Sequence, residues 1–366
     1  MVQKLALLGR EMFSAASFDC RPDGGTAAAQ AVLQGCCSRG DGFMHFAVSD
    51  GGQAGLDSMA AKLGIETFKL PLQPDTLLVD INRVALQVHE NPHIRLVLLD
   101  QSSQLRCQPL AEIRAALPGN IILAYDASQD GALILGGVVP QPLLSGADIL
   151  LGNTHDNIPG PLKGYIAFAD VADAADSKVS ALLKGLHSDP PPASCHAESI
   201  APFYLALVEM QIFARPYAEL AVRNAKALAA GLYAEGLNVS GRSFGFTETH
   251  QVHLGIGSAD GALRTAADSL SRAGIRCDAI EMPGSAGQQG LRFGVQALTR
   301  RGVDEAGMAH IARLIVDVVL RRERSDSVRH EVCTFLRGHP LQLLHFSLDE
   351  HYGAPYGQRL REESNA

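Results

Sequence analysis

The sequence predicts an α/β protein with a mostly parallel sheet, because short apolar runs alternate with stretches of helical periodicity. Five such runs lie in the first half of the chain, at 43–49, 93–100, 120–128, 147–154 and 164–170. Alternation of this kind is typical of a parallel sheet that helices cover on both faces. We therefore expect the carboxyl ends of these strands to meet at one edge, where open sheets bind their ligands.

The second half of the chain predicts a smaller α+β module. A long helical pattern runs from about Phe203 to Glu235, and we expect Pro216 to kink or split it at a hinge between domains. Apolar runs and helical patterns alternate after it, at 250–257, 259–273, 275–281, 291–296 and 303–322. The expected division is a short amino-terminal segment (1–20), a large α/β domain (21–215), a small α+β domain (216–325) and a carboxyl-terminal tail (326–366). Within the tail, the first half of residues 338–366 is expected to pack and the last ten or so, which are polar, to fray.

Composition narrows the possible partners and location. The chain has 366 residues, 46% of them hydrophobic, which is enough for a substantial core. Its formal net charge is −8 with scattered Lys and Arg, so we expect no nucleic-acid partner. It contains no run of roughly 18 apolar residues and opens without a secretory pattern, so we expect a cytoplasmic protein that does not cross a membrane.

The seven cysteines predict neither a disulfide framework nor a zinc site, because their number is odd and no C-x-x-C spacing occurs. Cys195 and His196 are adjacent, but a catalytic Cys and His normally meet through the fold rather than along the chain. We expect most of the cysteines to be buried thiols and no metal to be bound.

Polar residues at the strand ends are the candidate site. Gly24, Gly25 and Thr26 precede an Ala-rich helix, where free N–H groups and the helix dipole favour an anion, although Thr26 could instead be a simple N-cap. Asp126 ends one expected strand, while His155 and Asp156 follow the next.

In this order the residues resemble the serine hydroxymethyltransferase branch of fold-type I pyridoxal-phosphate enzymes. The stretch "DASQDGALILGGVVPQPLLSGADILLGNTHDNIPGPLKGYIAF" is similar to the family's Asp-x-x-His strand end and its T-H-K-T-L-x-G-P-R-G-G loop. Downstream, "YAELAVRNAKALAAGL", "TETHQVHLGIG" and "GLRFGVQALTRRG" resemble its inter-domain helix, its T-D-N-H-L-x-L strand and its G-x-R-x-G motif. The resemblance implies an aminotransferase-like large domain with a small α+β domain after it.

The resemblance implies roles for the residues that match. Arg292 matches the arginine that holds the substrate α-carboxylate, and Asp126 matches the acid that pairs with the pyridine nitrogen. Gly24, Gly25 and Thr26 match the phosphate cup without its first hydroxyl, and His155 matches the histidine before the lysine. Ser102, or its neighbour in "DQSSQ", matches a serine near the ring's phenolic oxygen.

Other positions depart from the family pattern. The Schiff-base lysine falls on Asp156, so no covalent cofactor anchor is expected there. The ring-stacking histidine falls on Asp50, and the histidine of the Asp-x-x-His pair on Gln129. The long amino-terminal arm that supplies folate contacts has no counterpart in the first twenty residues. Folate-dependent serine–glycine interconversion is therefore not expected.

Three interpretations remain open. The first is an enzyme, a transferase or lyase, that holds pyridoxal phosphate or pyridoxamine phosphate non-covalently, with Asp156 or His155 as the proton-transfer base. The second is a pocket for an amino-acid-like ligand without cofactor. The third is a non-catalytic subunit, because fold-type I sites form at dimer interfaces. A homodimer is expected, or a heterodimer with an active relative.

Two side chains carry separate expectations. We expect Lys163 to be a solvated turn residue rather than a displaced Schiff-base lysine. We expect Arg292 to face Asp126, His155 and Asp156 across a cavity. An Arg292 that is already paired with an acid, with no cavity beside it, would overturn both ligand-binding interpretations and leave the non-catalytic subunit.

Overall fold

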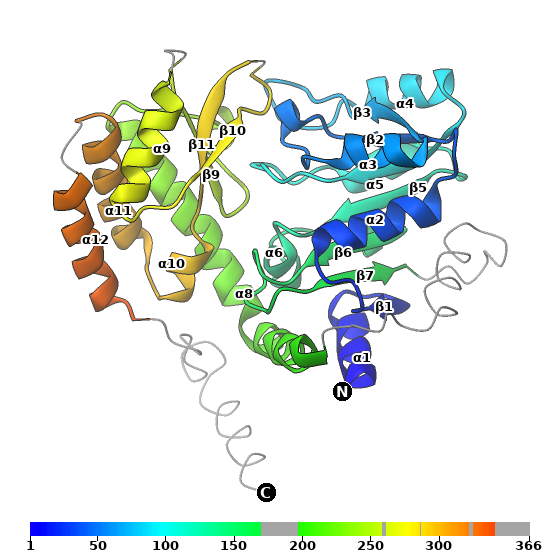
Figure 1. Ribbon diagram of the computed structural model, residues 1–366, viewed down its shortest axis with the longest axis horizontal. Helices are drawn as coiled ribbons and strands as arrows, with labels where there is room; N and C mark the ends of the chain where they lie inside the picture. Colours follow the sequence, from blue (N-terminus) through cyan, green and yellow to red (C-terminus); the bar gives the residue numbers. More distant parts are fainter. Residues whose placement is uncertain (170–196, 258–260, 286, 322–324, 341–366) are drawn as a thin grey trace, which may run out of the picture.

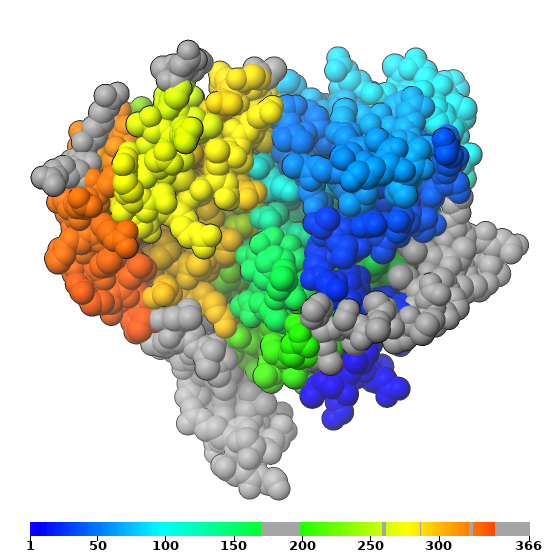
Figure 2. Space-filling view, in the orientation of Figure 1, coloured from blue at the N-terminus to red at the C-terminus, as the bar shows by residue number. Residues whose placement is uncertain are grey.

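The computed structural model describes the chain except residues 170–196, 258–260, 286, 322–324 and 341–366. A large domain and a small domain lie side by side, and one long helix runs through both (Figure 1). The space-filling view shows the two domains in contact, with the amino-terminal residues at the base of the large domain (Figure 2). In the described part of the chain, no helix is long and apolar enough to cross a membrane.

The large domain contains a seven-stranded sheet in the order β1-β7-β6-β5-β4-β2-β3. The strands from β3 to β6 in this order are parallel, whereas β7 is antiparallel to both of its neighbours. The strands are β1 (Ser17–Asp19), β2 (Gly42–His45), β3 (Glu66–Lys69), β4 (Ile94–Leu99), β5 (Ile122–Asp126), β6 (Ile149–Asn153) and β7 (Gly164–Phe168). The predicted mixed α/β fold with a mostly parallel sheet is confirmed.

Helices cover both faces of this sheet. Along β4, Leu96 and Leu98 pack against the face covered by α2, while Val97 and Leu99 join the larger core on the other face. Residues alternate between faces because side chains of a strand point alternately up and down. The helices of this domain are α1 (Val2–Met12), α2 (Gly25–Cys36), α3 (Leu56–Leu63), α4 (Ile81–Glu90), α5 (Leu110–Ala116) and α6 (Gly131–Leu135), with 3-10 turns η1 (Val48–Asp50) and η2 (Leu143–Ser145).

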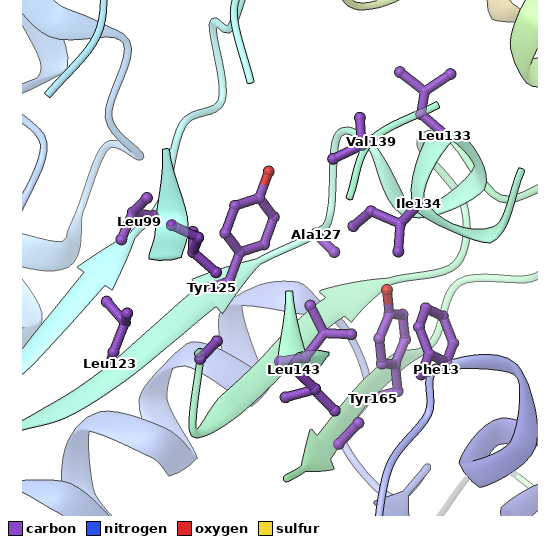
Figure 3. Close-up of a cluster of buried hydrophobic side chains, with 14 of the residues drawn as sticks. Phe13, Leu99, Leu123, Tyr125, Ala127, Leu133, Ile134, Val139, Leu143 and Tyr165 are labelled. Atoms are coloured by element: carbon purple, nitrogen blue, oxygen red, sulfur yellow. The ribbon is translucent and has the colours of Figure 1, made fainter. Parts of the chain in front are cut away.

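The larger core contains aromatic rings as well as aliphatic side chains. Phe13 stacks on Tyr165 with ring centroids 4.9 Å apart. Tyr125 and Tyr165 rise from neighbouring parts of the sheet among Leu, Ile and Val side chains (Figure 3). Phe13 follows α1, so the amino-terminal segment is part of the core rather than a loose arm.

Helix α8 (Ala197–Ala234) belongs to both domains. It contains Pro202 and Pro216 and continues through both, so Pro216 does not split it. Its direction changes along its length, from the base of the large domain to the small domain (Figure 1). Its buried residues up to Ala221 join the large core and those from Ala225 onwards join the core of the small domain. The change of core therefore lies a few residues beyond Pro216.

The small domain pairs four strands in the order β10-β11-β9-β8, and helices pack on one side of them (Figure 1). Asp304 begins α11 as an N-cap and accepts a hydrogen bond of 2.9 Å from the N–H of Gly307. The elements are β8 (Asn238–Val239), η3 (Arg242–Phe244), β9 (Gln251–Gly255), α9 (Ala262–Arg272), β10 (Asp278–Glu281), β11 (Gln289–Gly294), α10 (Gln296–Arg300), α11 (Glu305–Val319) and α12 (Ser325–Gly338).

Helix α12 differs from the sequence prediction, and several residues named in the sequence analysis lie outside the described residues. Helix α12 falls in the segment expected to be a tail, and it buries Val328 and Val332 against the small domain. Cys195 and His196 lie outside the described residues, as do the last residues of the tail. The six cysteines in the described part of the chain form no disulfide with one another.

Candidate functional site

The site lies at the carboxyl edge of the large sheet, where β5 and β6 end beside the start of α2. A Cβ placed on Gly25 would lie 2.9 Å from Oγ of Ser128, which follows β5, and 3.5 Å from Cβ of Asn153, which ends β6. A side chain at position 25 would therefore press on Ser128, and glycine there lets α2 lie close to the two strand ends. The α2 amino terminus therefore lies next to the ends of β5 and β6, which carry Asp126 and the turn with Asp156.

Asp126 is a buried carboxyl group at the end of β5. One of its oxygens, Oδ1, accepts a hydrogen bond of 2.9 Å from the N–H of Ser128. Burial raises the pKa of Asp126 to about 6, and the negative charges of Asp100 and Asp156 raise it further, while the bonds from Ser128 lower it. Such an acid can share a proton with a basic ring nitrogen near neutral pH.

Asp156 is held in place by two amide side chains. Its Oδ2 accepts hydrogen bonds from Nδ2 of Asn153 at 2.7 Å and from Nε2 of Gln129 at 3.2 Å. The backbone N–H of Asp156 donates to Oδ1 of Asn153 at 3.1 Å, which closes the turn after β6. His155 lies beside it, with Nε2 3.7 Å from Oδ1 of Asp156, and its ring is more than one third exposed. The structure thus brings both predicted proton-transfer groups to the same rim.

The predicted anion cup begins α2. Gly24 is its N-cap, Gly25 is buried and Thr26 is exposed to solvent. Thr26 does not cap the helix with its own side chain, because the N-cap position belongs to Gly24. The first-turn N–H groups of an α-helix lack intrahelical partners and attract anions.

Lys163 is buried, whereas the sequence predicted a solvated side chain. Its side chain is fully buried rather than solvated, and Nζ donates to Oδ1 of Asp23 at 2.9 Å and to the carbonyl oxygen of Arg21 at 3.1 Å. A buried ammonium needs such partners because removal from water is costly. Lys163 consequently ties the β6–β7 connection to the turn that precedes the cup.

Arg292 on β11 contacts both domains. Its NH2 group donates to Oδ2 of Asp278 at 2.7 Å, its Nε donates to the same oxygen at 3.2 Å, and its NH1 group donates to the carbonyl oxygen of Ser102. Asp278 is its partner across the β10–β11 pair and is 64% exposed. Arg292 is thus already paired with an acid, and it does not line the small-domain cavity described below. Its contact with Ser102 is through the backbone carbonyl of that residue.

Gln251 on β9 connects Arg292 with Asp156. Its Oε1 accepts from the N–H of Gln104 at 2.9 Å, so its Nε2 is the donor end. That Nε2 donates to the Ser102 carbonyl at 3.1 Å and to Oε1 of Gln129 at 3.2 Å. Gln129 must then present its own Nε2 to Asp156. One hydrogen-bond network therefore orients Arg292 and Asp156 across the domain boundary.

Two buried histidines of the small domain lie next to this network. Nε2 of His253 is 3.1 Å from Oε1 of Gln251, and Nδ1 of His250 is 3.4 Å from Nδ2 of Asn157. Burial lowers the pKa of each histidine to about 3, and the charge of Arg292 lowers it further. Both rings are therefore neutral at ordinary pH.

Asp130 is a buried acid that sequence reasoning missed. It accepts a hydrogen bond from the hydroxyl of Tyr125 and one of 3.4 Å from Nε2 of Gln104, while its Oδ1 has no partner among the described residues. Burial raises its pKa to about 7. Only its position just after the Asp126 turn could have suggested it.

Asp50 lies beside the segment that carries Ser102, because the carbonyl oxygen of Gly51 accepts a hydrogen bond of 3.0 Å from the N–H of Ser103. It ends the η1 turn after β2, and burial raises its pKa, as does Glu281, while a hydrogen bond from the backbone of Gly284 lowers it. No hydrogen bond or ion pair in the described part of the chain joins it to Asp126 or Asp156. Nor do the described residues contain a cluster of His, Cys, Asp or Glu able to hold a metal.

The family model for serine hydroxymethyltransferase matches residues 8–315. The chain belongs to the serine hydroxymethyltransferase family. It is 33% identical to the serine hydroxymethyltransferase of Methanopyrus kandleri over 334 residues, which is 89% of this chain and 76% of that protein. It is 32% identical to that of Pyrobaculum calidifontis, covering 90% of this chain and 76% of that protein.

A solved relative is similar over nearly the whole chain. The crystal structure of L-threonine transaldolase from Pseudomonas fluorescens, in its internal aldimine state, superimposes with a TM-score of 0.88 at 44% identity. The match covers 99% of this chain and 81% of the other. The fold-type I architecture is thus shared with an enzyme whose structure was determined with an internal aldimine.

Proposed function

We propose that this protein is an atypical serine hydroxymethyltransferase-family protein that binds a free α-amino acid or a similar carboxylate without a lysine anchor and without folate. The ligand lies between Arg292 and Asp156, and its chemistry is that of a transferase or lyase. The hydrogen-bond network from Arg292 through Gln251 and Gln129 to Asp156 supports this most directly.

Charge complementarity supports an amino acid as the ligand. The guanidinium of Arg292 matches an α-carboxylate, and the carboxylates of Asp156 and Asp126 match an α-ammonium group. A lysine at position 156 would repel that ammonium, so an aspartate there favours the free amino acid. The solved relative is named for L-threonine, which makes L-threonine the first ligand to test.

Arg292 can exchange its present partner for a ligand. Asp278 is largely exposed, and exposed ion pairs contribute roughly 0–1 kcal/mol. A ligand carboxylate in a more enclosed position would compete well with such a pair. The NH1 bond to the Ser102 carbonyl can stay in place during the exchange.

The cup and Asp126 fit a pyridoxal-type cofactor, although position 156 does not fit a covalent link to it. The space beside Gly24 at the α2 amino terminus is open, the helix N–H groups there suit a phosphate, and Asp126 is a buried acid suited to a ring nitrogen. When bound, such a cofactor acts as an electron sink. Asp156 and His155 are the groups that could hold or move a proton beside it.

The test is to restore the lysine. Purified protein should be colourless and should release added pyridoxal phosphate on dialysis. Asp156→Lys should retain it, and borohydride reduction should leave label on the peptide that contains residue 156. Asp156→Asn is the matched control and should retain none. Stable, borohydride-sensitive colour in the unmodified protein, with label on Lys163, would show that the anchor lies elsewhere.

The alternative function is a non-catalytic subunit, and a specific observation favours it. Arg292 is bonded to Asp278, and Asp156 to Asn153 and Gln129, so the network is complete without a ligand. Titration calorimetry with L-threonine, glycine and L-serine, each with and without pyridoxal phosphate, distinguishes the two. Binding by none of them would favour the subunit. We also propose a homodimer, and light scattering that shows a monomer at micromolar concentration would contradict it.

A further inference from the structure

A cavity in the small domain lies on the far side of β11 from the candidate site. It has a volume of about 170 Å³ and is enclosed by β11, α10, α11, α12 and the segment after α9. Its walls are largely apolar and include Phe293, Ile311, Ile315, Val332 and Phe335. Phe293 follows Arg292 and points to the opposite face, because side chains alternate along a strand.

An apolar cavity of this size favours an apolar occupant over water. Protein interiors are close-packed, and an unfilled space deprives its lining of dispersion contacts. Water gains little there because it needs polar partners, and apolar cavities of comparable size stay dry and take up apolar molecules. A short alkyl chain or a single aromatic ring would fill the space.

One charged side chain lines this cavity. Arg276 is exposed, and no hydrogen bond or ion pair joins it to another residue in the described ranges. A guanidinium presents a planar set of donors that suits a carboxylate. An apolar interior with a single arginine at its border is complementary to a molecule with an apolar body and one carboxylate.

We propose that this cavity binds a small amphiphilic carboxylate, with its apolar part against Phe293 and Ile315 and its carboxylate on Arg276. The site is separate from the rim that holds Asp126 and Asp156, and it does not depend on the function proposed there. Because Phe293 and Arg292 are neighbours on β11, an occupant would also stiffen the strand that carries Arg292.

The experiment uses the intact chain and two probes of equal length, octanoate and 1-octanol, in titration calorimetry. Octanoate should bind saturably with one site per chain, and 1-octanol should bind about tenfold more weakly, because it lacks the charge-assisted bonds. Arg276→Gln should reduce octanoate affinity by about tenfold and leave 1-octanol unchanged. Arg272→Gln, an exposed arginine on α9 that does not line the cavity, is the matched control.

A second variant tests the cavity itself. Ala297 is exposed and lines the opening, so Ala297→Trp should obstruct both probes while the melting temperature stays near that of the unmodified protein. Equal binding of the two probes, with no effect of Arg276→Gln, would contradict the proposal that Arg276 binds the carboxylate of the occupant. Absence of saturable binding of either probe would overturn the site.

Discussion

The two sides of the domain boundary bury titratable groups of opposite kinds. On the large-domain side, Asp126 and Asp130 have pKa values raised to about 6 and about 7. On the small-domain side, His250 and His253 have pKa values lowered to about 3. The acids become neutral by keeping a proton and the histidines by losing one. Burial therefore disfavours the charged form of these groups on both sides of the boundary, and Arg292 and Asp156 lie between them.

The two sides respond to pH in opposite directions. The acids have folded-state pKa values above their unfolded values, so the stability they contribute is fully present below about pH 4 and is lost as pH rises through about 6 to 7. The histidines have folded-state pKa values below the unfolded value, so their contribution is present above about pH 6.5 and is lost as pH falls towards 3. Between about pH 4 and 6.5 the two effects oppose each other, which flattens the dependence of stability on pH.

The largest expected effect comes from removing one acid. The difference in free energy of unfolding between Asp130→Asn and the unmodified protein should change with pH. It should increase in favour of the variant by about 4 kcal/mol as pH rises from 4 to 8, because the variant has no buried carboxyl group to ionise. Urea unfolding at the two pH values measures this difference. Asp75→Asn, at an exposed position, is the control and should show none. A difference independent of pH would mean that folding does not change the pKa of Asp130.

The second-largest expected effect comes from replacing Arg292, which lies between the two domains. Arg292→Lys keeps the positive charge but loses the bidentate geometry, so we expect L-threonine binding to weaken by about 1.5–3 kcal/mol with near-normal melting. Calorimetry and thermal unfolding, run on the same samples, separate the two effects. Arg264→Lys, on the exposed face of α9, is the control. Lost thermal stability with unchanged ligand binding would assign Arg292 to bracing the domains.

The smallest expected effect comes from replacing a buried histidine on the small-domain side of the boundary. The difference in free energy of unfolding between His253→Leu and the unmodified protein should also change with pH. It should increase in favour of the variant by about 2 kcal/mol as pH falls from 7.5 to 5, because the variant has no buried ring that must remain uncharged. The sign is opposite to that of Asp130→Asn. Urea unfolding again provides the measurement, with exposed His89→Gln as the control. If the stability difference changed with pH in the same direction in both variants, the buried acids and the buried histidines would not have opposite effects on the pH dependence of stability.

Strands buried on both faces were predictable from the sequence. The apolar runs that became β2, β4, β5, β6 and β7 were located within a few residues, because continuous apolar stretches leave few other structures open. The edge strand β3 was missed because its four residues are only partly buried and alternate weakly. Helix α12 was missed because its buried face is narrow, with Val328 and Val332 as its buried residues.

Site residues were predictable where the chain places them at strand ends. Asp126 and Asp156 follow adjacent strands, so their proximity follows from the parallel sheet. Gln251 was not predictable, because its partners Ser102 and Gln129 lie more than a hundred residues away in the sequence. Its polar side chain at a buried strand position was the one available signal. Lys163 looked solvated because its acidic partner Asp23 lies far along the chain.

The complete burial of Lys163 makes this side chain a natural reporter. Amine-labelling reagents reach lysines from solvent, so exposed Lys62 should react at once. Lys163 can react only when the turn at residues 21–24 separates from the β6–β7 connection and breaks the bond to Asp23. The labelling rate of this single amine therefore measures how often the anion cup opens. A ligand that occupies the cup should slow that labelling without touching Lys163 itself.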